Sequence, residues 1–124
     1  MKLAFSIQNW EGIEWQEFCD VAEDTGMKGV EIYDIDAPIF QGKSTPTNPE
    51  FSSATRRALQ NQGLNIPCID TVSDFTSEDF LSEFTECMEV AVNLNVPAIS
   101  VHTENKDHDT CVESLSILDR KSVV

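Results

Sequence analysis

The feature of this sequence that most constrains its fold is a repeated alternation of strand-like and helix-like segments. Short apolar or β-branched runs begin near residues 2, 29, 65 and 97, so they recur about every 27 to 36 residues. Segments with helical spacing of apolar residues follow each of them. Strands that alternate with helices at this spacing indicate βαβ units and a parallel sheet. The predicted fold class is therefore α/β, built from (βα) repeats.

Capping and turn residues indicate where the elements begin and end. Strands are expected at residues 2–7, 29–34, 65–70 and 97–102, and helices at 14–25, 49–62, 80–94 and from about 107 onward. Gly26 and Gly63 stand where the first two helices should stop. Asn48 followed by Pro49 is a good helix start, and Thr76–Asp79 resembles a capping box before the third helix.

Composition and charge exclude several classes of protein. The chain has 22 acidic and 8 basic residues, so its formal net charge is −14. This charge argues against nucleic-acid binding and against docking on an anionic membrane. The N-terminus lacks the apolar stretch of a secretory signal, so a cytoplasmic protein is expected. The four cysteines form no CxxC pair, which argues against a zinc site. Because no secretory signal is expected, the cysteines should be reduced and mostly buried.

One edge of the predicted sheet is where polar side chains should gather. Right-handed crossovers place the C-terminal ends of parallel strands on the same rim, and active sites of α/β folds lie there. Strand alternation puts Val30 and Ile32 on one face and Glu31 and Tyr33 on the other. Because an open sheet has helices on both faces, a charged Glu31 in mid-strand favours a barrel with a polar lumen.

The ordered segments of this chain resemble a known family. MKLAFSIQNW, DTGMKGVEIYD, NQGLNIPCID and NVPAISVH are similar to the opening of the xylose isomerase-like TIM-barrel family, which includes sugar phosphate isomerases and epimerases. The junction Thr25–Ile32 is the most recognisable piece. The resemblance implies a (βα)₈ barrel, a divalent metal (Mn, Mg or Zn) and proton transfer beside a carbonyl carbon. It also implies metal and acid/base carboxylates mostly on strands five to eight.

The resemblance suggests candidate substrate-binding residues at the strand ends and on the inner face. These candidates are Trp10, Glu31, Tyr33, Asp70 and His102. Trp10 and Tyr33 either form an apolar wall against a sugar or pack the core. Glu31 orients substrate or makes an ion pair inside the barrel, and Asp70 lines the rim or caps the next loop. His102 contacts substrate, ligates a metal or has a structural role; no other metal ligand is assigned.

Only four strands are expected, whereas a whole barrel needs about 200 to 250 residues. Residues 1–118 are therefore expected to be the N-terminal part of a sugar or sugar phosphate isomerase or epimerase. This part alone should bind no metal and be inactive. The sequence assigns no catalytic residues within it. The last helix, with Val112, Leu115 and Leu118 on one side, stops in mid-pattern. Asp119–Val124 matches the translation of a sequencing adapter (GAT-CGG-AAG-AGC-GTC-GTG), so these six residues are expected to be a non-native tail.

Two other functions remain open from the sequence. A natural half-barrel would be a binding module that pairs with itself or another chain, because four strands leave two open edges and self-association is expected. An AP endonuclease-like member of the same fold is the second alternative, although the negative charge disfavours it. The loop at 35–48, which carries Phe40 and Lys43, is a candidate lid, and Lys43 would be its cation for a phosphate.

Overall fold

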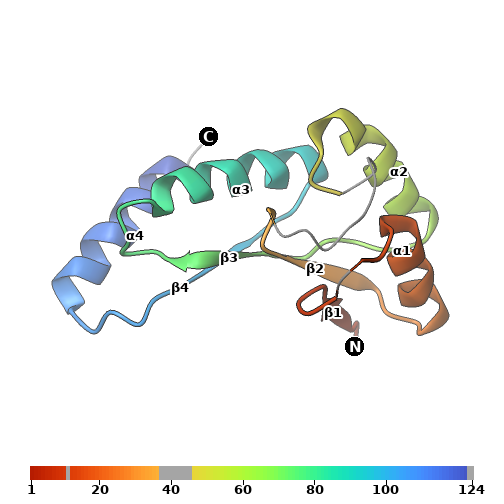
Figure 1. The fold of residues 1–124 in the computed structure, drawn as a ribbon, viewed down its shortest axis with the longest axis horizontal. Helices are drawn as coiled ribbons and strands as arrows, with labels where there is room; N and C mark the ends of the chain where they lie inside the picture. Colours follow the sequence, from red (N-terminus) through yellow and green to blue (C-terminus); the bar gives the residue numbers. More distant parts are fainter. Residues whose placement is uncertain (11, 37–45, 123–124) are drawn as a thin grey trace.

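The computed structural model describes residues 1–10, 12–36 and 46–122 (Figure 1). Its elements are, in chain order, β1 (Ala4–Ser6), α1 (Trp15–Asp24), β2 (Gly29–Tyr33), the 3₁₀ helix η1 (Pro49–Phe51), α2 (Ser52–Asn61), β3 (Ile69–Asp74), α3 (Phe80–Leu94), β4 (Ile99–His102) and α4 (His108–Ser122). Strands and helices alternate, which confirms the α/β fold class built from (βα) repeats. Across these described ranges, no helix combines the length and the apolarity needed to cross a membrane.

The strands form one sheet in the order in which they occur along the chain. β1, β2, β3 and β4 are neighbours in that order, and all pairs are parallel. A doubly wound sheet would reverse direction at a switch point. Sequential order is instead that of a barrel wall, and the ribbon shows α2 and α3 together on one side of the strands (Figure 1).

Burial alternates along the strands as the sequence predicts. Val30 and Ile32 are fully buried in the core under the helices, whereas Glu31 and Tyr33 lie half-buried on the opposite face. The same alternation recurs in β4, where the aliphatic residues pack against the core and the polar ones are exposed. The prediction of an aliphatic outer face and a polar inner face is therefore confirmed.

Most of the predicted helix boundaries are confirmed, with one exception. Gly26 and Gly63 have φ of 74° and 65° at the ends of α1 and α2, a conformation that glycine adopts without strain. The Asn48 side chain accepts a hydrogen bond from the Glu50 amide (3.1 Å), so it caps the start of η1. The predicted capping box at Thr76–Asp79 is wrong. The Asp79 side chain makes no capping bond to α3, because the helix is entered through a turn instead.

The third strand lies further along the chain than the sequence predicts. It runs from Ile69 to Asp74 rather than over residues 65–70, and Asn65 makes only an isolated bridge with Gly29. Pro67 cannot donate a hydrogen bond to a neighbouring strand, so the regular ladder begins after it. Asp70 therefore lies near the beginning of β3, and Asp74 occupies the strand end.

All four cysteines are free thiols, as expected for a chain in which no secretory signal is predicted. Cys19 and Cys87 are buried, while Cys68 and Cys111 are half-buried. Burial raises the pKa of the Cys19 and Cys87 thiols to about 12. These two side chains therefore act as small apolar groups of the core.

The last helix is held to the rest of the molecule by little apolar contact. Leu118 is the buried residue of α4, whereas Val112 and Leu115 are 49% and 43% exposed. The three side chains that the sequence places on one side of α4 therefore differ in burial, and two of them are uncovered. The described part of the chain contains no strand beyond β4 that would cover them.

Candidate functional site

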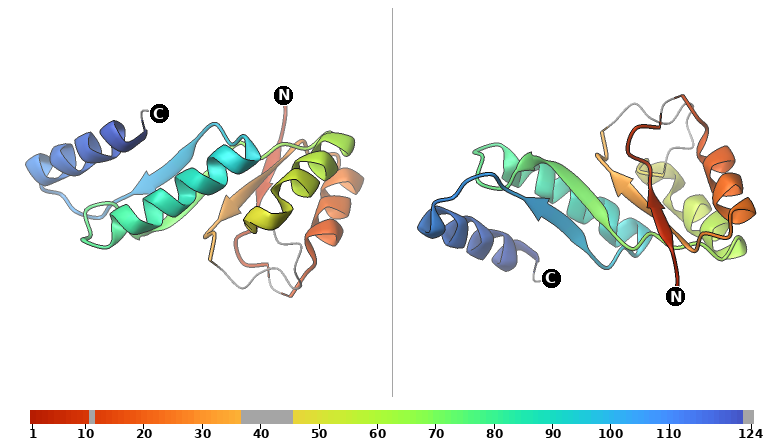
Figure 2. Two further views of the ribbon diagram at one scale, coloured as in Figure 1. Left: turned by 90° about the horizontal axis from the view of Figure 1, so that it is seen from above. Right: turned by 90° about the horizontal axis from the view of Figure 1, so that it is seen from below.

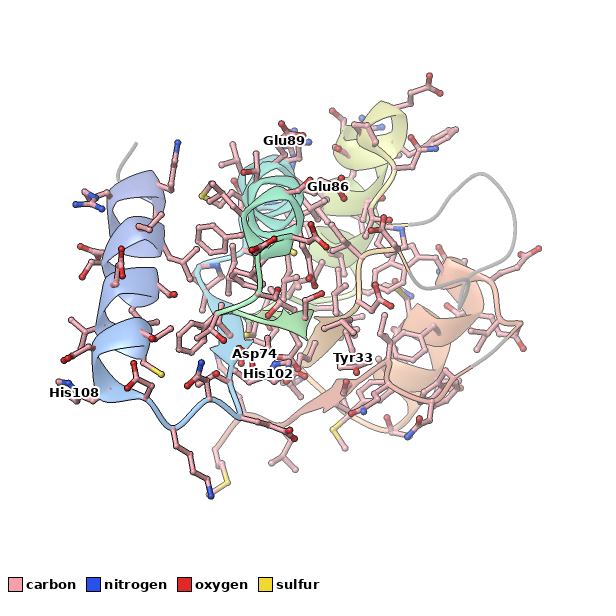
Figure 3. The ribbon with its side chains drawn as sticks, turned by 60° about the vertical axis from the view of Figure 1, so that its left-hand side comes forward. Tyr33, Asp74, Glu86, Glu89, His102 and His108 are labelled. Carbon is pink, nitrogen blue, oxygen red and sulfur yellow. The ribbon has the colours of Figure 1, made fainter. Side chains whose placement is uncertain are left out.

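The C-terminal ends of the parallel strands define one rim of the sheet. β2 ends at Tyr33, β3 at Asp74 and β4 at His102. Asp74 and His102 are register partners on adjacent strands, and the two side chains lie near each other in Figure 3. The rim therefore carries a phenol, a carboxylate and an imidazole on three neighbouring strands.

A pair of carboxyl groups lies on the inner face below this rim. Glu31 is the register partner of Ser6 on β1, and Asp70 is the register partner of Tyr33 on β2. A side-chain hydrogen bond with Asp70 raises the pKa of Glu31 to about 7; burial and the charge of Asp70 add to the rise, and a hydrogen bond with Ser6 opposes it. Two carboxyl groups this close hold one proton between them near neutral pH. The partner of Glu31 is thus a second acid rather than the cation of an ion pair.

The thiol of Cys68 adjoins this carboxyl pair. Its Sγ lies 4.0 Å from Oδ1 of Asp70. Burial, with the charges of Asp70 and Glu31, raises the pKa of the Cys68 thiol. The thiol therefore stays protonated and adds a weak donor to the inner face.

Asp74 is the most heavily hydrogen-bonded side chain at the rim. Its carboxylate accepts from the amide and hydroxyl of Thr76 (2.8 and 2.7 Å), the hydroxyl of Thr103 (2.8 Å) and the amide of Glu104 (2.9 Å). These donors, the amides most strongly, hold the pKa of Asp74 far below its usual range. The ionised carboxylate therefore ties the end of β3 to the loop that follows His102.

A glutamate of α3 supports the irregular stretch of β3 before Asp74. Between Asp70 and Asp74 the β3 ladder advances four residues while β4 advances only from Ser100 to His102. The extra residues leave backbone donors without a strand partner. The Glu83 carboxylate accepts from the amides of Val72 (2.6 Å) and Ser73 (3.2 Å). A bulge that would otherwise leave amides unpaired is thus stabilised from the helix layer.

The structure separates the residues that the sequence singled out. Glu31, Tyr33 and Asp70 share the inner face of β2 and β3, and His102 is exposed at the end of β4. Trp10 lies in an aromatic cluster, with its ring centroid 4.9 Å from Phe18 in an edge-on arrangement and 6.1 Å from Phe5. The proposed lid residues Phe40 and Lys43 lie outside the described residues.

Other polar groups lie away from the rim. His108 begins α4, with an 88% exposed side chain that contacts the neighbouring Asp109. Glu86 and Glu89 are exposed on the outer side of α3 (Figure 3).

Sequence reasoning missed Asp74 and Glu83. A local signal existed for Asp74, because an aspartate two residues before a threonine is typical of a turn closed by its carboxylate. No local signal existed for Glu83, whose partners lie in another element.

The residues present do not by themselves form a metal centre. Within residues 1–10, 12–36 and 46–122, no three histidine, cysteine, aspartate or glutamate side chains lie in a group that would hold a metal ion. His102 and Asp74 supply two such groups at the rim. The histidine, cysteine, aspartate and glutamate side chains of the described residues therefore do not fit a resident divalent metal.

Sequential parallel strands, helices on the outer face and a polar inner face define this chain as part of a (βα) barrel. Solved structures share this fold. The xylose isomerase domain protein of Planctomyces limnophilus superposes with a TM-score of 0.62 at 20% identity, over 98% of this chain and 49% of that one. The chain has the fold of the first half of a xylose isomerase-like TIM barrel.

Two further solved structures show the same half-length match. The 3-keto-D-glucoside 4-epimerase YcjR of E. coli has a TM-score of 0.66 at 14% identity, over 98% of this chain and 50% of that one. The "probable 3-DHS dehydratase AsbF" of Bacillus anthracis has a TM-score of 0.65 at 13% identity, over 97% and 46%. This chain therefore spans about half the length of each. By sequence, no family model and no curated protein matches it.

Proposed function

We propose that this chain is the N-terminal half of a metal-dependent isomerase or epimerase that acts on a sugar or a sugar phosphate. The observation that carries the proposal is the polar inner face of the half-barrel. There Asp70, which forms a carboxyl pair with Glu31, is the register partner of Tyr33, and Asp74 is the register partner of His102. The half-length match to a barrel named as a keto-glucoside epimerase supports this reaction class.

Each group on this face suits the recognition of a sugar. The Tyr33 ring offers an apolar surface to a carbon face, with a hydroxyl at its tip. The Glu31–Asp70 pair both donates and accepts, because one of its two acids keeps a proton. His102 is exposed at the rim and offers a ring nitrogen to a hydroxyl or phosphate oxygen. The proposed role of this half is therefore to bind and orient the substrate.

The second half of the parent enzyme would supply the chemistry itself. Isomerisation moves a proton on a carbon beside a carbonyl, and a bound Mn, Mg or Zn ion would polarise that carbonyl as a Lewis acid. The described residues provide no metal-binding group of three. We therefore assign the metal ligands and the proton-transferring groups to strands that follow β4 in the parent, and we expect this chain alone to be inactive.

Two measurements on the 124-residue chain test the proposal. A turnover assay with Mn²⁺ and a panel of ketoses should show no product, and clear turnover would overturn the assignment of the chemistry to the second half. Titration with the same sugars, followed by NMR of ¹⁵N-labelled protein, should shift the amides of Tyr33 and His102 at about 10 mM, as weak binding predicts. Tyr33→Ala should abolish these shifts, and His108→Ala, remote from the rim, should not. No shift with any sugar would refute the binding role.

The gene provides an independent test of the boundary. The codons of Asp119–Val124 decide whether these residues are the adapter translation, and different codons would refute that idea. A reading frame that resumes after Leu118 with acidic residues and histidine at later strand ends would support the parent enzyme. A natural stop codon at this point would favour a self-contained half-barrel.

A further inference from the structure

The pairing of β3 with β4 changes register before the rim. Asp70 lies opposite Ser100, and Asp74 lies opposite His102. Between these two pairs β3 advances four residues, from 70 to 74, whereas β4 advances two, from 100 to 102. In a regular ladder both strands advance equally, and Val72 would then lie opposite His102. Two neighbours for His102 are thus possible in this sequence, a valine and an aspartate.

The backbone hydrogen bonds show which amide the change of register displaces. The Ile69 amide donates to the Ala98 carbonyl (3.1 Å). In a regular parallel ladder every second amide repeats this bond, so the Ser73 amide would donate to the His102 carbonyl. In the structure the Phe75 amide donates to that carbonyl instead, at 3.0 Å. The bulge therefore deprives the Ser73 amide of its ladder acceptor.

A side chain of α3 supplies the acceptor that the bulge removes. α3 packs against β3 and β4, as both views of Figure 2 show. The Glu83 carboxylate of this helix accepts from the Ser73 amide (3.2 Å) and from the Val72 amide (2.6 Å). Bonds to a charged acceptor are stronger than bonds between neutral groups. Glu83 therefore stabilises the bulged register relative to the regular one, in which the Ser73 amide would pair with β4.

The Asp74 carboxylate holds the same register from the rim. It accepts from the Thr103 hydroxyl (2.8 Å) and the Glu104 amide (2.9 Å), which follow His102 in the chain. In a regular ladder Asp74 would lie opposite Glu104, beyond the last residue of β4. Two like charges directly opposite each other destabilise a sheet. The bulged register thus replaces an acid–acid pair by an acid–imidazole pair.

We propose that Glu83 is a positioning residue of the rim. Its two bonds to the bulge select the register in which Asp74 lies opposite His102. Without these bonds the regular register would place Val72 there, and the imidazole would have an isopropyl group beside it instead of a carboxylate. The inference rests on the proposed function only where it treats His102 as a sugar contact, because the register itself needs no ligand.

Hydrogen exchange of the full chain, followed by NMR, tests the choice of register. In Glu83→Ala the Phe75 amide should exchange at least about tenfold faster, because the loss of two bonds to a charged acceptor favours the register in which Phe75 has no bond to His102. The Ile69 amide, whose bond lies before the bulge, should keep its rate. Glu83→Gln keeps one oxygen acceptor. Its Phe75 rate should therefore lie between those of the wild type and Glu83→Ala.

Nuclear Overhauser effects across the ladder identify the register directly. In the wild type, the backbone of His102 should show contacts with Asp74. In Glu83→Ala, contacts between His102 and Val72 should appear, and those with Asp74 should weaken. Glu86→Ala removes an exposed acid from the same helix and is the matched control, so it should keep the wild-type pattern.

The outcomes separate selection of the register from local support of the bulge. An unchanged Phe75 rate in Glu83→Ala would mean that Glu83 supports the bulge only locally, and it would overturn the proposal. Faster exchange without contacts between His102 and Val72 would overturn it as well. If circular dichroism shows that Glu83→Ala does not fold, Glu83→Gln decides, since an unchanged Phe75 rate in that variant refutes the same point.

A sugar titration separates this inference from the proposed function. In Glu83→Ala the sugar-induced shift of the His102 amide should weaken, while that of Tyr33 on β2 should remain. An undiminished His102 shift would refute a positioning role toward the sugar. If the wild type shows no shift with any sugar, the binding role fails, and the exchange rates and ladder contacts still decide the register.

Discussion

The proton shared by Glu31 and Asp70 should make the stability of this fold depend on pH in a defined window. The pKa of Glu31 rises from 4.5 to about 7 on folding. The folded chain therefore holds a proton that the unfolded chain releases between these values. The stabilisation is complete below about pH 4.5 and is lost as the pH rises through about 7. Stability should thus fall across the window.

The size of the effect follows from the shift and from the exposure of the pair. The difference between 4.5 and about 7 corresponds to at most about 3 kcal/mol in the free energy of unfolding. Glu31 is half-buried on an open face, and solvent screening reduces this value to about 1 kcal/mol. The thiols of Cys19 and Cys87 titrate near 12, and Asp74 titrates well below its usual range. All three groups therefore lie outside the window.

Glu31→Gln removes the titratable carboxyl group at this position and keeps a hydrogen-bond donor for Asp70. Urea unfolding followed by tryptophan fluorescence should show the wild-type free energy falling by about 1 kcal/mol between about pH 5 and pH 8. The variant should change by less than half as much. Glu17→Gln on the exposed face of α1 makes the same change of charge and should keep the wild-type slope. Protein concentration must be fixed across the series, because self-association would add stability.

Parallel pH curves for the wild type and Glu31→Gln would refute the reasoning. They would mean that the two acids titrate independently in the folded chain. A slope that also disappeared in Glu17→Gln would assign the dependence to overall charge.

Three further predictions concern the rim and the surface. Asp74→Asn should speed hydrogen exchange at the Glu104 amide. The ionised Asp74 carboxylate stabilises the fold above pH 3.8, and this stabilisation is lost on acidification. Below that pH, the variant should therefore lose less stability than the wild type. Glu83→Ala should lower the free energy of unfolding by about 1 to 3 kcal/mol and expose the Val72 amide to exchange, and unchanged exchange would contradict the support role. Self-association should be tighter in about 0.5 M than in about 0.05 M NaCl, because salt screens the repulsion between acidic copies.

The faces of the strands could be predicted from the sequence because they depend on a local rule. Side chains alternate along any strand, so the pattern of Val30, Glu31, Ile32 and Tyr33 identifies the inner face without knowledge of the neighbours. Helix ends at Gly26 and other glycines follow from the same kind of local preference. These features needed no tertiary information.

The contacts of Asp74 and Glu83 could not be predicted in the same way. Asp74 receives donors from Thr103 and Glu104, which lie 29 and 30 residues further along the chain. Glu83 reaches a bulge whose existence depends on how β3 meets β4. Both roles arise from the register between strands, which no single segment specifies when the ladder contains a bulge.

The wrong boundary of β3 had a chemical consequence. A strand over residues 65–70 would place Asp70 at the rim as an isolated carboxylate beside the substrate. The observed strand, displaced beyond Pro67, places Asp70 next to Tyr33 in register and within hydrogen-bonding reach of Glu31. The same displacement moves Asp74 to the rim, beside His102. Because the strand is displaced beyond Pro67, Asp74 lies at the strand end, where hydrogen bonds hold it ionised. Asp70 lies within the sheet, where it shares a proton with Glu31.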